Sequence, residues 1–176
     1  CSNQNKPTKQ IDNTPINVNN LEKQSLRVGF IPITCASPII MAEPMGFYNK
    51  FGMEVKVVKM PSWGAVRDSA IAGELDAYHM LAPMPISMTL GLGTSPFSVK
   101  LASIENINGQ AITVANRHKG KVNGPADMKG FVFGVPFPYS MHNLLLRYYL
   151  AKGGVDPDKD VQIRPVPPPD SIAQLV

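Results

Sequence analysis

Residues 54–80 alternate between strand-like and helix-like patterns, and this alternation restricts the possible folds more than any other feature of the sequence. Residues 54–60 place valines among lysines, residues 62–73 carry small and apolar side chains at helical spacing, and residues 75–80 are strand-like again. A strand, helix, strand order joins parallel strands through a right-handed crossover. The pattern therefore predicts a parallel α/β sheet, in which the turn before the helix and the end of the second strand meet in one crevice.

Trp63 and His79 occupy the two positions that this crevice would bring together. Trp63 lies in the turn, next to Gly64, and His79 lies at the end of the second strand. An indole N–H can donate one hydrogen bond, and glycine permits close approach of the backbone to a ligand. We expect Trp63 and His79 to face one small molecule. The alternatives, a core aromatic at a helix start and a satisfied interior histidine, stay open.

The rest of the chain repeats the alternation in two blocks separated by a polar, glycine-rich passage at residues 116–129. The first block, residues 26–115, adds strands at 26–33, 97–104 and 111–115, a helix at 39–51 interrupted by Pro44, and a helix at 86–92. The second block, residues 130–176, has strands at 130–136 and 161–166, a helix at 141–152 capped by Ser140, and the first turn of another helix. Two α/β units joined by a crossing predict a two-lobed α/β protein whose second lobe is partial here.

The first 25 residues differ in composition from the rest. They are rich in Asn, Gln, Thr, Lys and Pro and begin with Cys1 instead of methionine. Such a segment has too little apolar surface to fold. Its start resembles a mature bacterial lipoprotein, whose N-terminal cysteine carries the lipid after the targeting segment is removed. We expect a disordered tether over residues 1–25, a lipid on Cys1, and a position at the cell membrane facing the periplasm or the extracellular side; a sequence that merely starts at this cysteine is the alternative.

Charge and composition argue against several classes of protein. The net charge is +4 and the pI is about 9.1, without a run of basic residues interleaved with aromatic ones. This argues against a nucleic-acid partner, although a basic surface helps to attract a small anion. The two cysteines are too few for a disulfide framework or a zinc site. We expect no cofactor, no metal and no enzymatic activity.

Six short motifs follow one another along the chain, at residues 26–32, 46–48, 62–68, 75–85, 108–113 and 142–148. Together they resemble the nitrate/bicarbonate branch of the ABC-transporter substrate-binding proteins, which is related to the sulfonate and taurine receptors. The resemblance implies a periplasmic-binding-protein-like (type II) fold, incomplete at the C-terminus. It also implies an ABC permease and an ATPase as partners, and nitrate, nitrite or bicarbonate as the ligand.

The resemblance places ligand contacts at Trp63 and Gly64. His79 and Tyr139 depart from the residues of the nitrate receptors but keep a hydrogen-bond donor. Further polar contacts of that family, including a lysine, lie beyond the motifs present in this sequence.

Helix N-termini supply what a small, flat oxyanion requires, namely unpaired amides and a positive potential. Two predicted helices begin directly after strands, at residues 62–65 and 139–142, one in each lobe. We therefore add Ser140 and His142 to the predicted ligand site. A plain N-cap role for Ser140 and a structural, neutral state for His142 are the alternatives.

Other functional classes share this fold. A cytoplasmic sensor of nitrate or nitrite would lack an export signal, so the Cys1 tether argues against it. A thiamine-pyrimidine-synthase-like enzyme uses a cysteine-rich motif that the sequence does not contain. A sulfonate or taurine receptor differs mainly in its ligand. We expect a lipid-anchored receptor that captures an oxyanion, with nitrate or nitrite ahead of bicarbonate.

Overall fold

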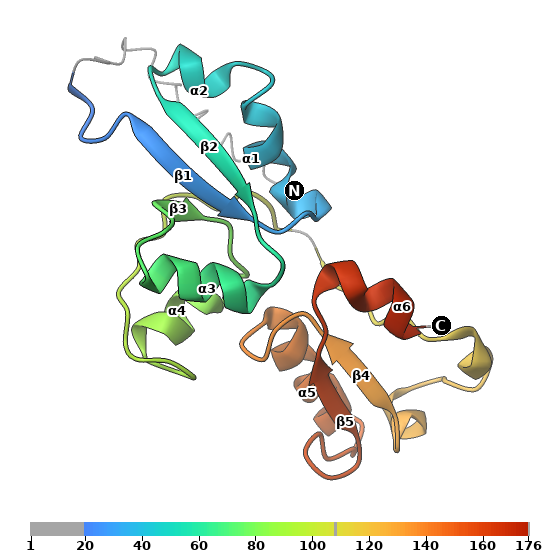
Figure 1. The fold of residues 1–176 in the computed structure, drawn as a ribbon. Coiled ribbons are helices and arrows are strands. Elements are labelled where there is room, and N and C mark those ends of the chain that lie inside the picture. Colours follow the sequence, from blue (N-terminus) through green and yellow to red (C-terminus); the bar gives the residue numbers. More distant parts are fainter. Residues whose placement is uncertain (1–19, 108, 176) are drawn as a thin grey trace, which may run out of the picture.

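The computed structural model describes residues 20–107 and 109–175 and shows two parallel sheets (Figure 1). The first sheet has the strand order β2-β1-β3, with β1 at Ser25–Phe30, β2 at Glu54–Lys59 and β3 at Ala77–Tyr78. β1 pairs with β2 along its whole length. The second sheet pairs β4 (Val132–Val135) with β5 (Gln162–Pro165). The parallel pairing in both sheets confirms the predicted α/β class.

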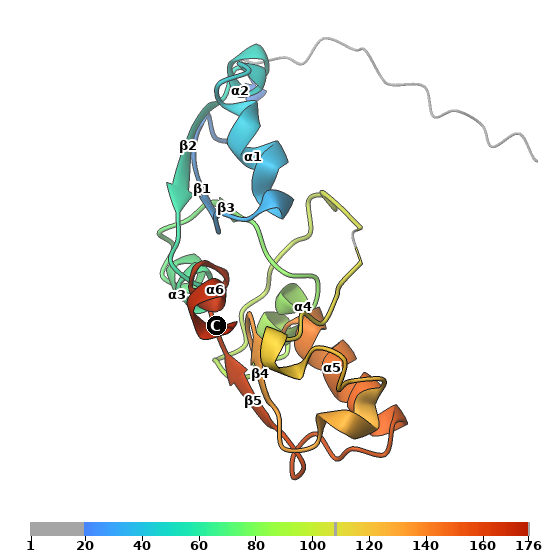
Figure 2. The same cartoon turned by 90° about the vertical axis from the view of Figure 1, so that its right-hand side faces the viewer.

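Helices flank the first sheet on both faces. α1 (Ser37–Ala42) and α2 (Phe47–Lys50) join β1 to β2, whereas α3 (Trp63–Ile71) joins β2 to β3, and α4 (Met84–Thr89) follows β3. Because β2 and β3 lie on opposite sides of β1, right-handed crossovers place α1 and α2 on one face and α3 on the other. Figures 1 and 2 show this arrangement.

The predicted helix at residues 39–51 is two short helices. Pro44 lacks a backbone N–H, so the helical ladder stops before it. Gly46 then adopts a left-handed conformation with φ of 71° before α2 begins, which glycine does without steric cost. The interruption predicted from Pro44 is therefore confirmed.

The second sheet is covered by α5 (Met141–Lys152), with the bounds predicted from the sequence. Leu146 and Leu150 of α5 pack with Val135 of β4 in a cluster that also contains Met128, Val155 and Val161. A short helix, α6 (Ser171–Leu175), follows β5 through a 3-10 turn at Pro168–Asp170. The second sheet and its helices, the second unit, thus have a hydrophobic core of their own, to which the apolar residues of α5 contribute. The first sheet and its helices are the first unit.

The strands predicted at residues 97–104 and 111–115 are wrong for the described part of the chain. Within the described residues neither segment forms a strand, and most of their large apolar side chains are exposed, with Ile104 at 70%. A strand exists only where a second strand pairs with its backbone groups. Alternating hydrophobicity identifies a segment that fits a sheet but does not supply that partner.

The structure also bears on three further predictions from the sequence. The strand predicted at residues 75–80 is only two residues long, and the helix predicted at 86–92 begins at Met84, with Pro85 in its first turn. The crossing predicted at residues 116–129 contains two 3-10 turns, Asn116–His118 and Pro125–Met128, and as a lobe boundary stays a prediction.

Residues 1–19 lie outside the described residues. They include Cys1, the predicted site of the lipid, and all of the predicted tether except residues 20–25. The longest helix of the described stretches, α5, has 12 residues. Nowhere in those stretches is a helix both long enough and apolar enough to cross a bilayer.

Candidate functional site

The carboxyl ends of the strands in both sheets point toward the region between the sheets. In Figure 1 the arrowheads of β1 and β2 point toward the second sheet, and that of β4 points back toward the first. α3 begins shortly after β2, and α5 begins shortly after β4. The turns that open α3 and α5 therefore meet where ligands bind in open α/β sheets.

Trp63 is the first residue of α3. Ser62 precedes it as the N-cap, because its Oγ accepts a hydrogen bond from the Ala65 N–H at 3.2 Å. The Trp63 side chain is 0% exposed and lies in a buried cluster with Ile31 and Val66. This packing is that of a core aromatic at a helix start, the alternative named for Trp63 in the sequence. Trp63 thus packs the first unit whatever else it does.

His79 lies directly after β3, where its N–H donates to the Gly29 carbonyl at 2.9 Å. Its ring meets the Trp63 indole edge-on, with 5.2 Å between ring centroids and an interplanar angle of 60°. Burial lowers the pKa of His79 below its ordinary value and so favours the neutral imidazole. The structure therefore brings together the two residues that the sequence placed in one crevice.

Ser140 and His142 lie at the start of α5. Ser140 is 0% exposed, and its Oγ accepts a hydrogen bond from the Asn143 N–H at 3.1 Å, which confirms the predicted N-cap. Burial lowers the pKa of His142 as well. A neutral imidazole avoids placing a positive charge at the positive end of the helix dipole.

Four buried side-chain polar atoms in the described part of the chain have no hydrogen-bond partner. Three of them belong to predicted ligand residues: the indole Nε1 of Trp63 and the Nδ1 atoms of His79 and His142. The fourth is Oε2 of Glu105, in the extended segment after α4. Buried polar groups without a partner are rare and costly, so their gathering on the predicted residues points to a polar ligand.

Tyr139 and Gly64 lie where the two units touch. Tyr139 is half-buried and packs against the cluster that contains Trp63. A Cβ atom on Gly64 would lie 4.0 Å from Cε2 of Phe137, a residue of the second unit. Phe137 was not among the predicted site residues, although its place between the end of a predicted strand and a predicted helix start indicates a turn residue.

The donor set suits an anion better than a metal ion. Within the described ranges, no three His, Cys, Asp or Glu side chains come close enough to hold a metal. The groups without partners at the site are an indole N–H, which only donates, and imidazole nitrogens, of which a neutral ring has one donor and one acceptor. The chemistry available there is hydrogen bonding, with the indole N–H as a donor to acceptor oxygens.

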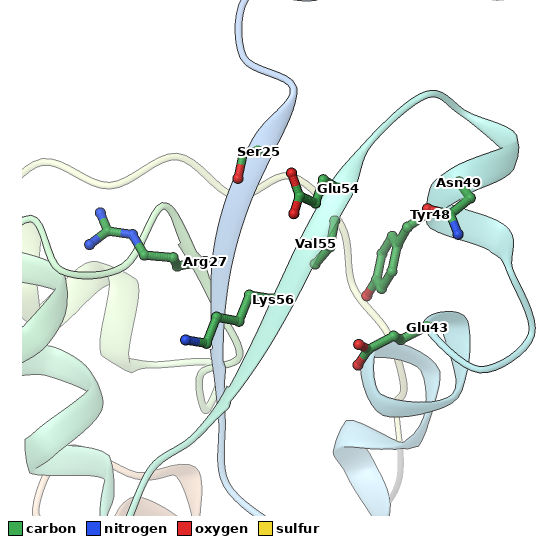
Figure 3. A pocket seen from close by; sticks show the side chains of 8 residues that line it. All are labelled: Ser25, Arg27, Glu43, Tyr48, Asn49, Glu54, Val55 and Lys56. Carbon is green, nitrogen blue, oxygen red and sulfur yellow. The ribbon is translucent and has the colours of Figure 1, made fainter.

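A surface depression of about 560 Å³ lies at the other end of the first sheet (Figure 3). Two of its polar residues, Arg27 and Tyr48, already have hydrogen-bond partners. Arg27 donates from Nε to Asp76 at 3.2 Å and from Nη2 to the Gly73 carbonyl, and Tyr48 donates to the Ile39 carbonyl. Figure 3 also shows Arg27 and Tyr48 on opposite sides of the strands. These polar groups have partners within the protein, so we do not place the ligand there.

Comparison with known proteins gives a consistent result. The chain matches the NMT1-like family over residues 19–176. The nitrate/nitrite binding protein NrtA of Nostoc sp. is 36% identical over 177 residues, which cover 90% of this chain and 40% of that protein. The bicarbonate transport ATP-binding protein CmpC of Synechococcus elongatus is 36% identical over 168 residues, which cover 88% of this chain and 25% of that protein.

The crystal structure of the periplasmic nitrate-binding protein NrtA from Synechocystis PCC 6803 superposes with a TM-score of 0.78 at 36% identity. The superposition covers 87% of this chain and 44% of that one. This match confirms the predicted resemblance and the periplasmic-binding-protein fold. The chain spans less than half the length of the relatives that it matches.

Proposed function

Since this chain belongs to the NMT1-like family, we propose that it forms the first part of an extracytoplasmic receptor for a small oxyanion. The receptor would deliver its ligand to an ABC permease driven by an ATPase. The observation that supports the proposal most directly is the group of buried, partnerless nitrogens on Trp63, His79 and His142. A ligand with acceptor oxygens would satisfy them, and the helix that begins at Trp63 would add its own N–H groups.

Nitrate fits this set of donors better than bicarbonate. Nitrate offers only acceptor oxygens, whereas bicarbonate also carries an O–H that requires an acceptor. The indole N–H of Trp63 cannot accept a hydrogen bond, none of the groups proposed for the site is a carboxylate, and the only acceptors among the partnerless nitrogens would be those of neutral imidazole rings at His79 and His142. The site needs no catalytic group to hold such a ligand, so we propose a binding protein and no enzymatic activity. The similarity to nitrate- and bicarbonate-named relatives supports this class of ligand.

Titration calorimetry of the full-length gene product with nitrate, nitrite, bicarbonate and taurine tests this proposal. We expect nitrate to bind, nitrite to bind comparably, and bicarbonate to bind more weakly. Binding of taurine alone would assign the protein to the sulfonate receptors. Failure of all four to bind would refute the oxyanion receptor.

The cellular location of the protein is a separate part of the proposal. We propose that Cys1 carries a lipid that holds the receptor at the membrane, on the periplasmic or extracellular side. Metabolic labelling with a palmitate analogue should mark the wild-type protein and spare a Cys1→Ala variant. An unlabelled protein in the cytoplasmic fraction would favour a sensor of the same fold instead.

A second candidate is a ligand-binding domain within an importer's ATPase subunit, because CmpC is named an ATP-binding protein. The printed sequence contains no GxxxxGK[ST] phosphate-binding loop. The nucleotide would thus bind elsewhere in such a subunit. A full-length gene product that includes this loop, and that binds ATP, would favour this second candidate.

A further inference from the structure

Phe137 belongs to the second unit by sequence but to the first unit by packing. It lies two residues after β4, yet its side chain is 8% exposed and is part of the buried cluster of Trp63, Val66 and Met84. The second unit has a separate core of its own. The Phe137 side chain thus crosses from one unit into the hydrophobic core of the other.

α3 holds the Phe137 ring at two places. The guanidinium carbon of Arg67 lies 5.7 Å from the ring centroid, a distance at which a cation–π attraction operates. One turn earlier on the same helix, Gly64 lies close to the ring, since a Cβ added there would be in ordinary van der Waals contact with Phe137 Cε2 at 4.0 Å. Both contacts lie in the first two turns of α3, the helix that begins with Trp63.

Tyr139 anchors the same turn at a third place. Its ring lies 5.9 Å from the Phe137 ring and packs against Gly93, just beyond α4. A Cβ on Gly93 would lie 2.8 Å from Tyr139 Cε2, so only glycine leaves space for the tyrosine ring there. The turn 137–139 therefore fits a surface shaped by α3 and by the segment after α4.

We propose that Phe137 is a positioning residue for the ligand site: it keeps the two units closed and keeps Trp63 in place without touching the ligand itself. This inference rests on the proposed function for its consequence on anion binding, although the closure can be measured without any ligand. Separating the units would expose the phenyl ring and open a cavity beside Trp63. Burial of one such side chain favours the closed arrangement by roughly 10- to 100-fold.

The effect on affinity follows from the population of the closed form. For a ligand that binds only the closed arrangement, the apparent affinity is the intrinsic affinity multiplied by the fraction of molecules that are closed. Removing the ring of Phe137 should therefore weaken anion binding by about tenfold or more if the open form becomes dominant. The indole and imidazole donors themselves stay unchanged.

The experiment compares Phe137→Ala with Phe133→Ala in the full-length gene product. Phe133 is the matched control because it lies in β4 and packs against the second unit's own cluster. We would measure the radius of gyration by X-ray scattering without ligand, the dissociation constant for nitrate, and the urea unfolding curve. Phe137→Ala should increase the radius of gyration and weaken nitrate binding, whereas Phe133→Ala should lower only the resistance to urea.

Two further variants keep the test decisive. If Phe137→Ala does not fold, Phe137→Leu removes the ring face that Arg67 covers while keeping an apolar side chain, and it should change both readouts in the same direction. Arg67→Met should give a smaller change of the same sign. An unchanged radius of gyration in the Phe137 variants would overturn the proposal. If the wild-type protein does not bind nitrate, the proposed function fails, and the scattering result alone decides the role of Phe137.

Discussion

Replacing Trp63 by phenylalanine separates the two roles of this residue, packing and ligand binding. The indole is fully buried, so Trp63→Ala should cost about 3–5 kcal/mol of stability and would confuse loss of fold with loss of binding. Phenylalanine keeps an aromatic ring in the cluster and removes the N–H. That N–H has no partner among the described residues, so its removal should cost a bond to a ligand and none within that part of the chain.

The expected magnitudes differ enough to be measured. A hydrogen bond to a charged group contributes about 1.5–3 kcal/mol, so the nitrate affinity of Trp63→Phe should fall roughly 10- to 150-fold. The smaller ring loses on the order of 1 kcal/mol of apolar burial. Removing a buried donor without a partner recovers about 1–3 kcal/mol of desolvation cost. Stability should therefore change little, while affinity falls strongly.

Two measurements on the same preparation check this prediction. Calorimetry with nitrate measures the affinity, and urea unfolding measures the stability. A Phe137→Leu variant is not a substitute here, because it acts on closure and leaves the indole donor in place. Nitrate affinity within about twofold of wild type, in a folded Trp63→Phe protein, would show that the indole N–H does not bind the anion. Trp63 would then be a core residue, and the ligand site would have to be sought elsewhere.

The remaining predictions concern stability and use urea unfolding as the assay. Gly29→Ala should destabilise the protein by about 1–3 kcal/mol, because its Cβ would lie 2.5 Å from Leu75 Cδ1, and a simultaneous Leu75→Val change should recover part of the loss. Ser140→Ala should cost about 1 kcal/mol, because the hydroxyl caps α5 from a fully buried position, whereas equal stability would refute the capping role. Hydrogen bonds from a lysine and an arginine hold the pKa of Asp76 far below its ordinary value, so the carboxylate stabilises the fold fully above about pH 4 and loses that effect only gradually as the pH falls below about 4. Asp76→Asn should therefore be less stable than wild type at about pH 7, and at about pH 3 the difference should have begun to narrow while most of it remains.

Local patterns in the sequence were sufficient for most helices. Ser140 followed by apolar residues at helical spacing predicts α5 with its observed bounds, because a cap and an amphipathic face lie within one stretch of chain. Ser62 and Pro44 similarly predict where α3 begins and where α1 and α2 separate. Each of these features depends on residues within a few positions of one another.

Strands were less predictable, because a strand depends on a partner that lies far away in the sequence. β1 and β2 pair over their full length, and their alternation predicts them well. Residues 97–104 have a comparable pattern, yet without a neighbouring strand in the described part of the chain they form no strand, and Leu101 and Ile104 are exposed. β3 is reduced to two residues for the same reason, since pairing with β1 involves only Ala77 and Tyr78.

The sequence by itself determined the α/β class, the family resemblance, and the meeting of Trp63 with His79, because strand order and crossover handedness bring the ends of parallel strands to one edge. Only the tertiary structure decided that Trp63 is fully buried with its N–H unpaired, and that Phe137 of the second unit completes the core of the first. Burial and closure depend on contacts between residues more than 70 positions apart, here Trp63 and Phe137 in one cluster. Such contacts leave no periodic signal in a single sequence, because packing selects for shape and apolar character and not for position along the chain.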